Sequence, residues 1–208
     1  NGETRETVLR GVKITRCRSA RYAVWETERY FYGVGGTSVD LLLGGGLIFL
    51  GTKGVVIRKV LIYDCHAWSG GGLYAHNSNN VLENVEVENC GSSWRGNILV
   101  ETQSHIVWKD GRLLGCTTTG HDGYDAVAMY IGESSSALVI DVAFESNSIT
   151  LSESGIFDSS IYIHARAAKH QAFTACTFTD NSSPTDANFT DLSIHPDFTG
   201  TVKIIDTN

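Results

Sequence analysis

Short stretches in which apolar and polar residues alternate recur along the whole chain. Residues 60–65 (VLIYDC) and 85–90 (VEVENC) are the clearest pair, because both end on a cysteine. Alternation with a period of two is typical of a strand that buries one face. Related hexamers end at four further positions: Cys17, Cys116, Asn147 and Asn181. The pattern therefore predicts one strand-sized unit that repeats along the chain.

The spacing of these hexamers indicates a regular coil. Cys17 and Cys65 lie 48 positions apart, which is about two periods, so a further rung is expected at residues 39–44 (VDLLLG). With Gly44 included, the steps between successive anchors are 27, 21, 25, 26, 31 and 34 residues. One residue type at one strand position in successive coils is what a solenoid of stacked strands requires.

Two further strands are expected in each coil, one upstream and one downstream of the hexamer. Upstream stretches include residues 55–57 and 106–108, and downstream stretches include 73–75 and 98–100. A β-sandwich would also contain many short strands, but it would not demand the same residue type at the same strand position. The predicted fold is therefore an all-β parallel solenoid of about seven coils with three short strands per coil, forming a single domain over residues 1–208.

This pattern resembles the right-handed parallel β-helix of the pectin-lyase-like superfamily, over nearly the whole chain from about Thr7 to Ile205. In that fold, like residues stack inside the turn after the second strand, often as an asparagine ladder. The resemblance implies such a column here, formed by Cys17, Cys65, Cys90, Cys116, Asn147 and Asn181. Stacked parallel Cβ vectors suit a disulfide poorly, so free thiols are expected, consistent with folding in a reducing cytoplasm.

Composition excludes several function classes. The 208 residues carry a net charge of -7, which disfavours nucleic acid as a partner because phosphate binding calls for a basic surface. The longest apolar stretch, residues 41–50, is interrupted by three glycines, so membrane insertion is not expected. The five cysteines include no Cys-x-x-Cys pair, and the glycines at 33–36 lack the lysine of a phosphate loop. No metal site and no cofactor are predicted.

Function in such a solenoid is expected on outward strand positions and on the longer turns. The outward positions of the downstream strands carry Tyr74 and His76 in one coil and Leu99 and Glu101 in the next. Tyr130 is expected in the coil after that, beside Glu101. Together these side chains would form a flat platform with polar tips. Such a platform suits sugar rings, and it would equally suit burial against a neighbouring subunit. Tryptophans in glycine- and serine-rich turns are expected to project from successive rungs on one side. The candidate carbohydrate-binding residues are Trp68, Tyr74, His76, Trp94, Arg95, His121, Tyr124 and Tyr130.

Most glycoside hydrolases need two carboxyl groups in the active site. Retaining enzymes hold them about 5–5.5 Å apart and inverting enzymes about 6.5–9.5 Å apart. Adjacent rungs of a solenoid, about 4.8 Å apart, supply such spacings. Glu101 facing Asp122 or Asp125 from the next turn is the candidate catalytic pair. Whether the protein is an enzyme stays open, with polysaccharide depolymerase as the expected activity.

The leading functional hypothesis is a phage tailspike-like domain, an excerpt of a longer chain, that binds and in one version hydrolyses a bacterial surface polysaccharide. Domains that resemble this one occur in phage tailspikes and appendages, in secreted polysaccharide lyases and hydrolases, and in adhesins. A homotrimer located in the virion tail is expected. One alternative is a purely structural shaft of a trimeric fibre. A further alternative is a secreted, extracellular polysaccharide lyase, with His76 or Tyr130 as base and Arg95 neutralising a uronate.

Overall fold

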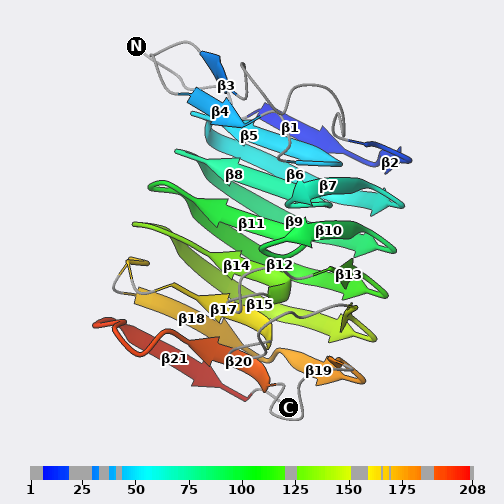
Figure 1. The fold of residues 1–208 in the computed structure, drawn as a ribbon. Helices are drawn as coiled ribbons and strands as arrows, with labels where there is room; N and C mark the ends of the chain where they lie inside the picture. Colours follow the sequence, from blue (N-terminus) through cyan, green and yellow to red (C-terminus); the bar gives the residue numbers. More distant parts are fainter. Residues whose placement is uncertain are drawn as a thin grey trace.

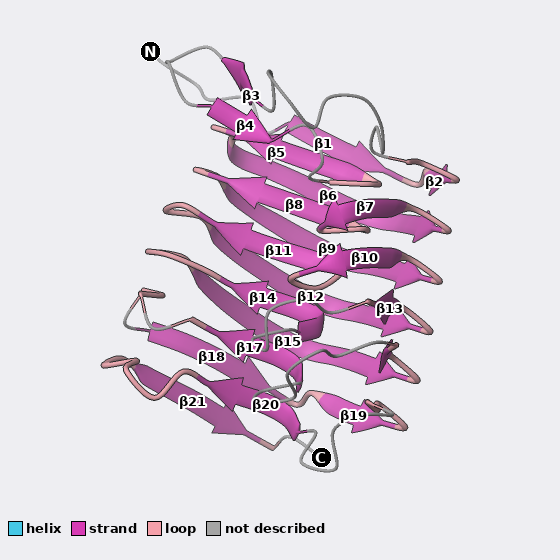
Figure 2. Ribbon diagram, in the orientation of Figure 1, coloured by secondary structure: helices cyan, strands magenta, loops and turns pink. Residues whose placement is uncertain are grey.

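The computed structural model describes residues 7–18, 30–32, 38–40, 44–119, 126–150, 159–164, 166–168, 170–183 and 190–206. Within these ranges every regular element is a β-strand, and no helix occurs (Figure 2). The strands form long parallel stacks, with one antiparallel hairpin, β3 (Tyr30–Tyr32) and β4 (Ser38–Asp40), near the start. The prediction of an all-β, parallel architecture is confirmed for the described residues.

The largest stack is the main sheet, in which neighbouring strands are parallel and follow the order β1-β6-β9-β12-β15-β18-β21. Two shorter strands join it: β2 (Lys13–Thr15) pairs with β6, and β19 (Thr177–Thr179) pairs with β15. The bounds are β1 (Thr7–Arg10), β6 (Lys53–Tyr63), β9 (Asn79–Glu88), β12 (His105–Leu114), β15 (Ser136–Glu145), β18 (His170–Thr174) and β21 (Thr201–Ile205).

Two further parallel sheets complete the arrangement. The short sheet comprises β7 (His66–Ser69), β10 (Gly91–Trp94), β13 (Thr117–Thr118) and β16 (Ser148–Ile149). The third sheet comprises β5 (Leu47–Leu50), β8 (Leu73–His76), β11 (Ile98–Glu101), β14 (Ala126–Ile131), β17 (Ser159–Ile163) and β20 (Thr190–Ile194). The chain visits the main, short and third sheets in turn and returns to the main sheet one layer further on (Figure 1). This arrangement is consistent with a parallel β-solenoid.

The rung expected at residues 39–44 is not present, and this prediction is wrong. Strand β4 pairs antiparallel with β3, outside the three stacks. Strand β2 pairs directly with β6, with Ile14 opposite Ile62, so the coils of Cys17 and Cys65 are immediate neighbours. The alternating pattern misled because a hairpin strand has the same period of two as a solenoid strand.

The upstream strand and the hexamer strand, expected as separate elements, form one continuous strand in β6, β9, β12 and β15. Each of these strands bends at a residue with a positive φ: Lys59 (52°), Asn84 (53°), Asp110 (51°) and Asp141 (52°). Asparagine and aspartate tolerate the left-handed conformation better than most residues, because their short side chains bond locally. Because of the bend, the two segments of each strand present outward surfaces that differ in orientation.

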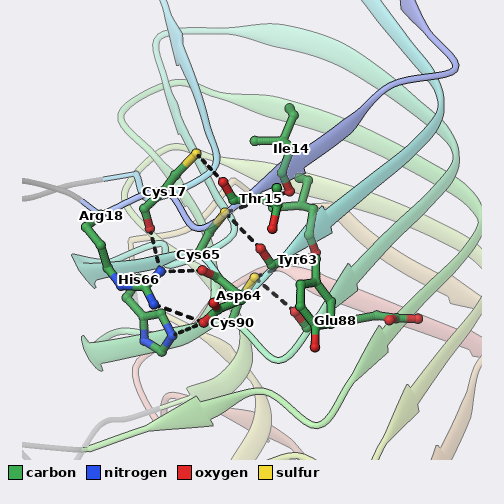
Figure 3. Close-up of polar contacts among 11 residues, drawn as sticks. Ile14, Thr15, Cys17, Arg18, Tyr63, Asp64, Cys65, His66, Glu88 and Cys90 are labelled. Atoms are coloured by element: carbon green, nitrogen blue, oxygen red, sulfur yellow. Dashed lines mark hydrogen bonds and ion pairs between the residues drawn. The ribbon is translucent and has the colours of Figure 1, made fainter.

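The predicted column of cysteine and asparagine is confirmed. His66, Gly91, Thr117 and Ser148 are in register, which places the preceding residues, Cys65, Cys90, Cys116 and Asn147, in one file. From Cys65 onward, the side chain of each coil bonds to a carbonyl of the preceding coil: Cys65 bonds to Ile14 O (Figure 3), and Cys90 bonds to Ile62 O. All five cysteines of the chain are free, as expected. Hydrogen bonding to Cys116 raises the pKa of Cys90 to about 12, and burial acts in the same direction.

Inward side chains fill the solenoid from end to end. Ile62, Val87, Leu113 and Phe144 occupy one register position of the main sheet, and none of them is exposed. Trp108 packs edge-on against Phe144, with ring centroids 5.8 Å apart, and donates Nε1–H to Val85 O at 3.3 Å. This apolar interior holds the sheets together and presents their outer faces as fixed surfaces.

Candidate functional site

The outer face of the third sheet carries a file of buried side chains, three tyrosines and one leucine. Tyr74, Leu99, Tyr130 and Tyr162 lie opposite one another on β8, β11, β14 and β17. Their exposed fractions are 2%, 1%, 3% and 0%, and they form a second apolar cluster outside the main core. The expectation that Tyr74 and Tyr130 belong to an open aromatic platform is therefore wrong, although their assigned role in sugar binding stays a prediction.

The register of Tyr130 also differs from the sequence-based expectation. Tyr130 was expected beside Glu101, but it pairs with Leu99, two residues earlier. A shift by two residues leaves every side chain on the same face, so the alternation of apolar and polar residues cannot detect it. The consequence is that Gly132, not a tyrosine, lies beside Glu101.

Next to the buried rings runs a file of polar side chains, which we call the polar column: His76, Glu101, His164 and His195. Glu101 pairs with His76 on the neighbouring strand, and the backbone N–H groups of His164 and His195 continue the same ladder. His164 and His195 lie 5.9 Å apart between ring centroids, and His164 lies 6.1 Å from the ring of Tyr130. The polar column is half-buried, so it lies at the surface beside a hydrophobic floor.

An ion pair occupies the centre of the polar column. Arg95 Nη1 donates to Glu101 Oε1 at 2.6 Å, and the two side chains are 30% and 19% exposed. The Arg95 guanidinium also lies over the ring of Trp94 at 3.7 Å and near that of Tyr130 at 5.1 Å. Two aromatic rings and a carboxylate thus fix the orientation of this cation.

Gly132 supplies the space in which Glu101 lies. A Cβ at Gly132 would meet Glu101 Cγ at 2.8 Å and Oε1 at 3.4 Å. Any larger residue would therefore have to displace the Glu101 side chain, and with it the pair to Arg95.

Two histidines of the polar column have lowered pKa values, which favours their neutral form. Burial lowers the pKa of His76, against the opposing charge of Glu101. Burial lowers the pKa of His164 as well, assisted by His195, Arg95 and Arg166 and opposed by Glu133. A neutral imidazole has one donor and one acceptor nitrogen, so each ring can bond a hydroxyl in either direction.

One ring nitrogen of His76 is hydrogen-bonded, and the other has no partner among the described residues. Its Nδ1 bonds to Tyr74 Oη at 3.0 Å. Its Nε2 is buried and has no hydrogen-bond partner among the residues that the structure describes. A buried polar atom without a partner costs about 1–3 kcal/mol, which a ligand hydroxyl or carbonyl could recover.

The predicted tryptophans do not share a face. Trp94 pairs with Ser69, so Trp68 and Trp94 fall at adjacent register positions, and side chains at adjacent positions point to opposite sides of a sheet. Trp68 is 41% exposed, whereas Trp94 is half-buried under Arg95. The expectation that both project from one side is wrong.

Four of the candidate residues lie outside the described residues: His121, Asp122, Tyr124 and Asp125. The predicted catalytic pairing of Glu101 with Asp122 or Asp125 therefore stays a prediction. Glu101 itself lies with Arg95 and His76; Arg95 contacts the rings of Trp94 and Tyr130, and His76 bonds to Tyr74. The structure therefore brings together six of the eleven candidates: Tyr74, His76, Trp94, Arg95, Glu101 and Tyr130.

Sequence reasoning missed a second polar cluster, at the short sheet. Arg18 Nη2 donates to Asp64 Oδ1 at 2.9 Å, and His66 Nε2 lies 3.2 Å from the same oxygen (Figure 3). Hydrogen bonding to Arg18 lowers the pKa of Asp64, with His66 in the same direction. Asp64 and His66 flank Cys65, so their proximity could be read from the sequence. The position of Arg18 beside Asp64 could not, because the two residues are 46 positions apart.

Further findings bear on the kind of site. Within the described ranges, no group of three histidine, cysteine or acidic side chains is placed to hold a metal ion. In the same part of the chain, no helix is long and apolar enough to cross a membrane. No protein-family model, curated protein or solved structure matches the sequence.

Proposed function

We propose that this chain is a right-handed parallel β-helix of about seven coils that binds a bacterial surface polysaccharide. In this proposal it belongs to a phage tailspike-like protein, assembles as a homotrimer and acts in the virion tail. The sugar-binding site is the polar column with Arg95 and the flanking rings. The single observation that carries the proposal is the buried Nε2 of His76 beside the Arg95–Glu101 pair, which lacks a hydrogen-bond partner among the described residues.

The chemistry of this site fits a sugar. Hydroxyl groups donate and accept hydrogen bonds, and the site offers both kinds of partner: carboxylate oxygens on Glu101, guanidinium N–H groups on Arg95 and neutral imidazoles on His76 and His164. The ring of Trp94 can stack on the C–H face of a sugar. Neutral histidines also limit the net charge at the site, which favours a hydroxyl-rich ligand over a strongly charged one.

Hydrolysis is a second, separable part of the proposal, with Glu101 as the catalytic carboxylate and Asp122 or Asp125 as its partner. Glu101 is 19% exposed and its carboxylate is fixed by Arg95 at 2.6 Å, so it is oriented before a ligand arrives. Fixed orientation of a reacting group is a large part of enzymatic rate enhancement.

A structural shaft of a trimeric fibre is the second candidate, and a specific observation favours it. Apart from Trp68, the large apolar residues exposed in the described part of the chain lie at the two ends of the stack. They are Val8, Val12, Ile48 and Leu50 at one end and Ile194 and Ile204 at the other. Apolar surface at both ends suits packing against further protein.

Binding to immobilised capsular polysaccharide and lipopolysaccharide from a panel of bacteria tests the proposal. We expect the purified protein to bind at least one glycan, and His76→Ala or Glu101→Gln to weaken binding by about tenfold. The first removes a hydrogen-bonding group and the second removes the charge that holds Arg95, each worth about 1–2 kcal/mol. His105→Ala, an exposed histidine on the main sheet, is the matched control and should bind as wild type.

The outcomes separate the candidates. Release of reducing ends by wild type but not by Glu101→Gln supports hydrolysis. Binding without release at any pH removes the catalytic part and leaves the binding part. Failure to bind every glycan, together with a stable trimer in solution, contradicts sugar binding and favours the shaft.

A further inference from the structure

A charged hollow lies on the outer side of the main sheet, away from the polar column. It encloses about 470 Å³ and is lined by Arg10, Arg58, Lys59, Glu83, Asn84, Lys109 and Asp110. Arg58 pairs with Arg10 on one side and Glu83 on the other, and Glu83 pairs with Lys109, so these four residues form one file across β1, β6, β9 and β12. Lys59, Asn84 and Asp110 are the bend residues of their strands.

The charge of this hollow is opposite to that of the chain. Its four cationic and two anionic side chains give a net charge of +2, whereas the whole chain carries -7. Glu83 is already paired with Arg58 at 2.5 Å. Arg10, Lys59 and Lys109 have no ion-pair partner among the described residues. Three cations therefore face a concave surface with their charge uncompensated, and a low-dielectric wall strengthens their field.

The arrangement of these cations follows the axis of the stack. Strands of a sheet lie about 4.8 Å apart, so Arg10 and Lys109, three strands apart, are separated by about 14 Å along the axis. Lys59, at the bend of β6, lies on a layer between them, and the layer of β9 carries Glu83 instead of a cation. Cations spread along the axis in this way suit a linear polymer that carries acidic groups at intervals.

Nucleic acid fits this surface less well. Single-stranded nucleic acids bind through aromatic side chains on which the bases stack, and none of the seven lining residues is aromatic. The carboxylates of Glu83 and Asp110 would repel a continuous phosphate backbone, but they can accept hydrogen bonds from sugar hydroxyls. The mixture of cations, carboxylates and one amide is thus suited to a chain of hydroxylated rings with spaced negative charges.

We propose that the charged hollow is a second glycan site, which binds an anionic polysaccharide through contacts of its acidic groups with Arg10, Lys59 and Lys109. Carboxylate, sulfate or phosphate substituents would supply the same charge. The inference uses different residues on a different sheet from the polar column, and it stands whether or not the polar column binds sugar.

The test compares two variants of equal net charge. The first replaces the hollow's cations (Arg10→Gln, Lys59→Gln, Lys109→Gln), and the second replaces three exposed cations elsewhere (Arg16→Gln, Lys53→Gln, Lys203→Gln). Binding of each protein to immobilised alginate, dextran sulfate, polyphosphate and neutral dextran is measured at about 0.05 M and about 0.5 M salt, because screening weakens exposed charge pairs. Circular dichroism and thermal melting confirm that each variant is folded.

We expect wild type to bind at least one of the acidic polymers, and the hollow variant to bind it about tenfold more weakly, with the control variant within about twofold of wild type. The acidic polymer that binds best identifies the substituent. Equal losses in both variants, equal binding to neutral dextran, or tighter binding to single-stranded DNA measured under the same conditions would overturn the proposal. If the triple variant does not fold, Lys59→Gln compared with Lys53→Gln gives the same comparison at equal net charge. The hollow variant leaves every residue of the polar column in place, so it should bind the glycan of the polar column as wild type does, which keeps the two results separate.

Discussion

At the scale of the residue, cysteine and asparagine serve one structural purpose in the internal column. Cys116 Sγ bonds to Val87 O at 3.6 Å, and Asn147 Nδ2 bonds to the equivalent carbonyl one coil on, Leu113 O, at 3.1 Å. Asn147 Oδ1 also accepts from the Cys116 backbone N–H at 2.9 Å. The thiol thus reproduces, more weakly, the bond of the amide N–H group to the carbonyl of the preceding coil.

Replacement of Asn147 measures how much its side-chain bonds contribute to stability and how much of that contribution a thiol can supply. Asn147→Ala removes the buried side-chain bonds to the Cys116 N–H, the Leu113 carbonyl and Asn181, so we expect the free energy of unfolding to fall by about 2–4 kcal/mol. Chemical denaturation monitored by circular dichroism gives the value. Asn147→Cys extends the cysteine column by one coil and should lose about half as much. Equal losses for alanine and cysteine would contradict the functional equivalence of thiol and amide in this column.

At the scale of the element, the bend in the long strands depends on single residues with positive φ. Asp141 lies at the bend of β15 with a φ of 52° and is exposed. The left-handed conformation costs an L-residue roughly 1–2 kcal/mol, and a β-branched side chain makes it worse. The bend in turn creates the concave surface of the charged hollow, where Lys59, Asn84 and Asp110 occupy the same structural position in β6, β9 and β12.

Substitution of Asp141 tests this conformational requirement away from the hollow. We expect Asp141→Val to lower the free energy of unfolding by about 1–2 kcal/mol through backbone strain alone, because the side chain makes no buried contact. Asp141→Gly should leave stability within about 0.5 kcal/mol of wild type, since glycine adopts positive φ without strain. Thermal melting of the two variants side by side gives the comparison. A destabilised glycine variant with a wild-type-like valine variant would refute the assignment.

At the scale of the whole molecule, stability should vary along the axis of the stack. Central strands such as β9, β12 and β15 are paired on both sides, whereas β1 and β21 have a neighbour on one side only within the described part of the chain (Figure 1). Each coil contacts only its neighbours, so the ends lack half of the contacts that stabilise an interior coil.

Amide hydrogen exchange detects this gradient. We expect amides of β9, β12 and β15 to exchange at least about tenfold more slowly than those of β1 and β21, because the end strands open without unfolding the rest. Mass spectrometry of peptides from each strand provides the rates. Protection of β1 or β21 that equals that of β12 in a monomeric sample would contradict an open-ended stack.

The sequence by itself determined the properties that depend on a period of two and on like residues in file. Alternation identified the strands, the recurrence of cysteine and asparagine placed Cys65, Cys90 and Cys116 in one column, and the parallel Cβ vectors of that column implied free thiols. These features lie within one hexamer or repeat from coil to coil, so they can be recognised in the sequence without knowledge of the fold. The lattice also placed His76 and Glu101 in one column, and β8 and β11 pair accordingly.

Only the tertiary structure decided what a period of two leaves undetermined. Register shifts by an even number of residues preserve the facing of every side chain, so the position of Tyr130 beside Leu99 could not be read from the pattern. Burial of Tyr74 and Tyr130, and the concave bend that gathers Arg10, Lys59 and Lys109, depend on how distant coils pack. Whether a stretch such as residues 38–40 joins the stack or forms a hairpin depends on the partner it finds, because strand pairing is satisfied by segments far apart in the chain.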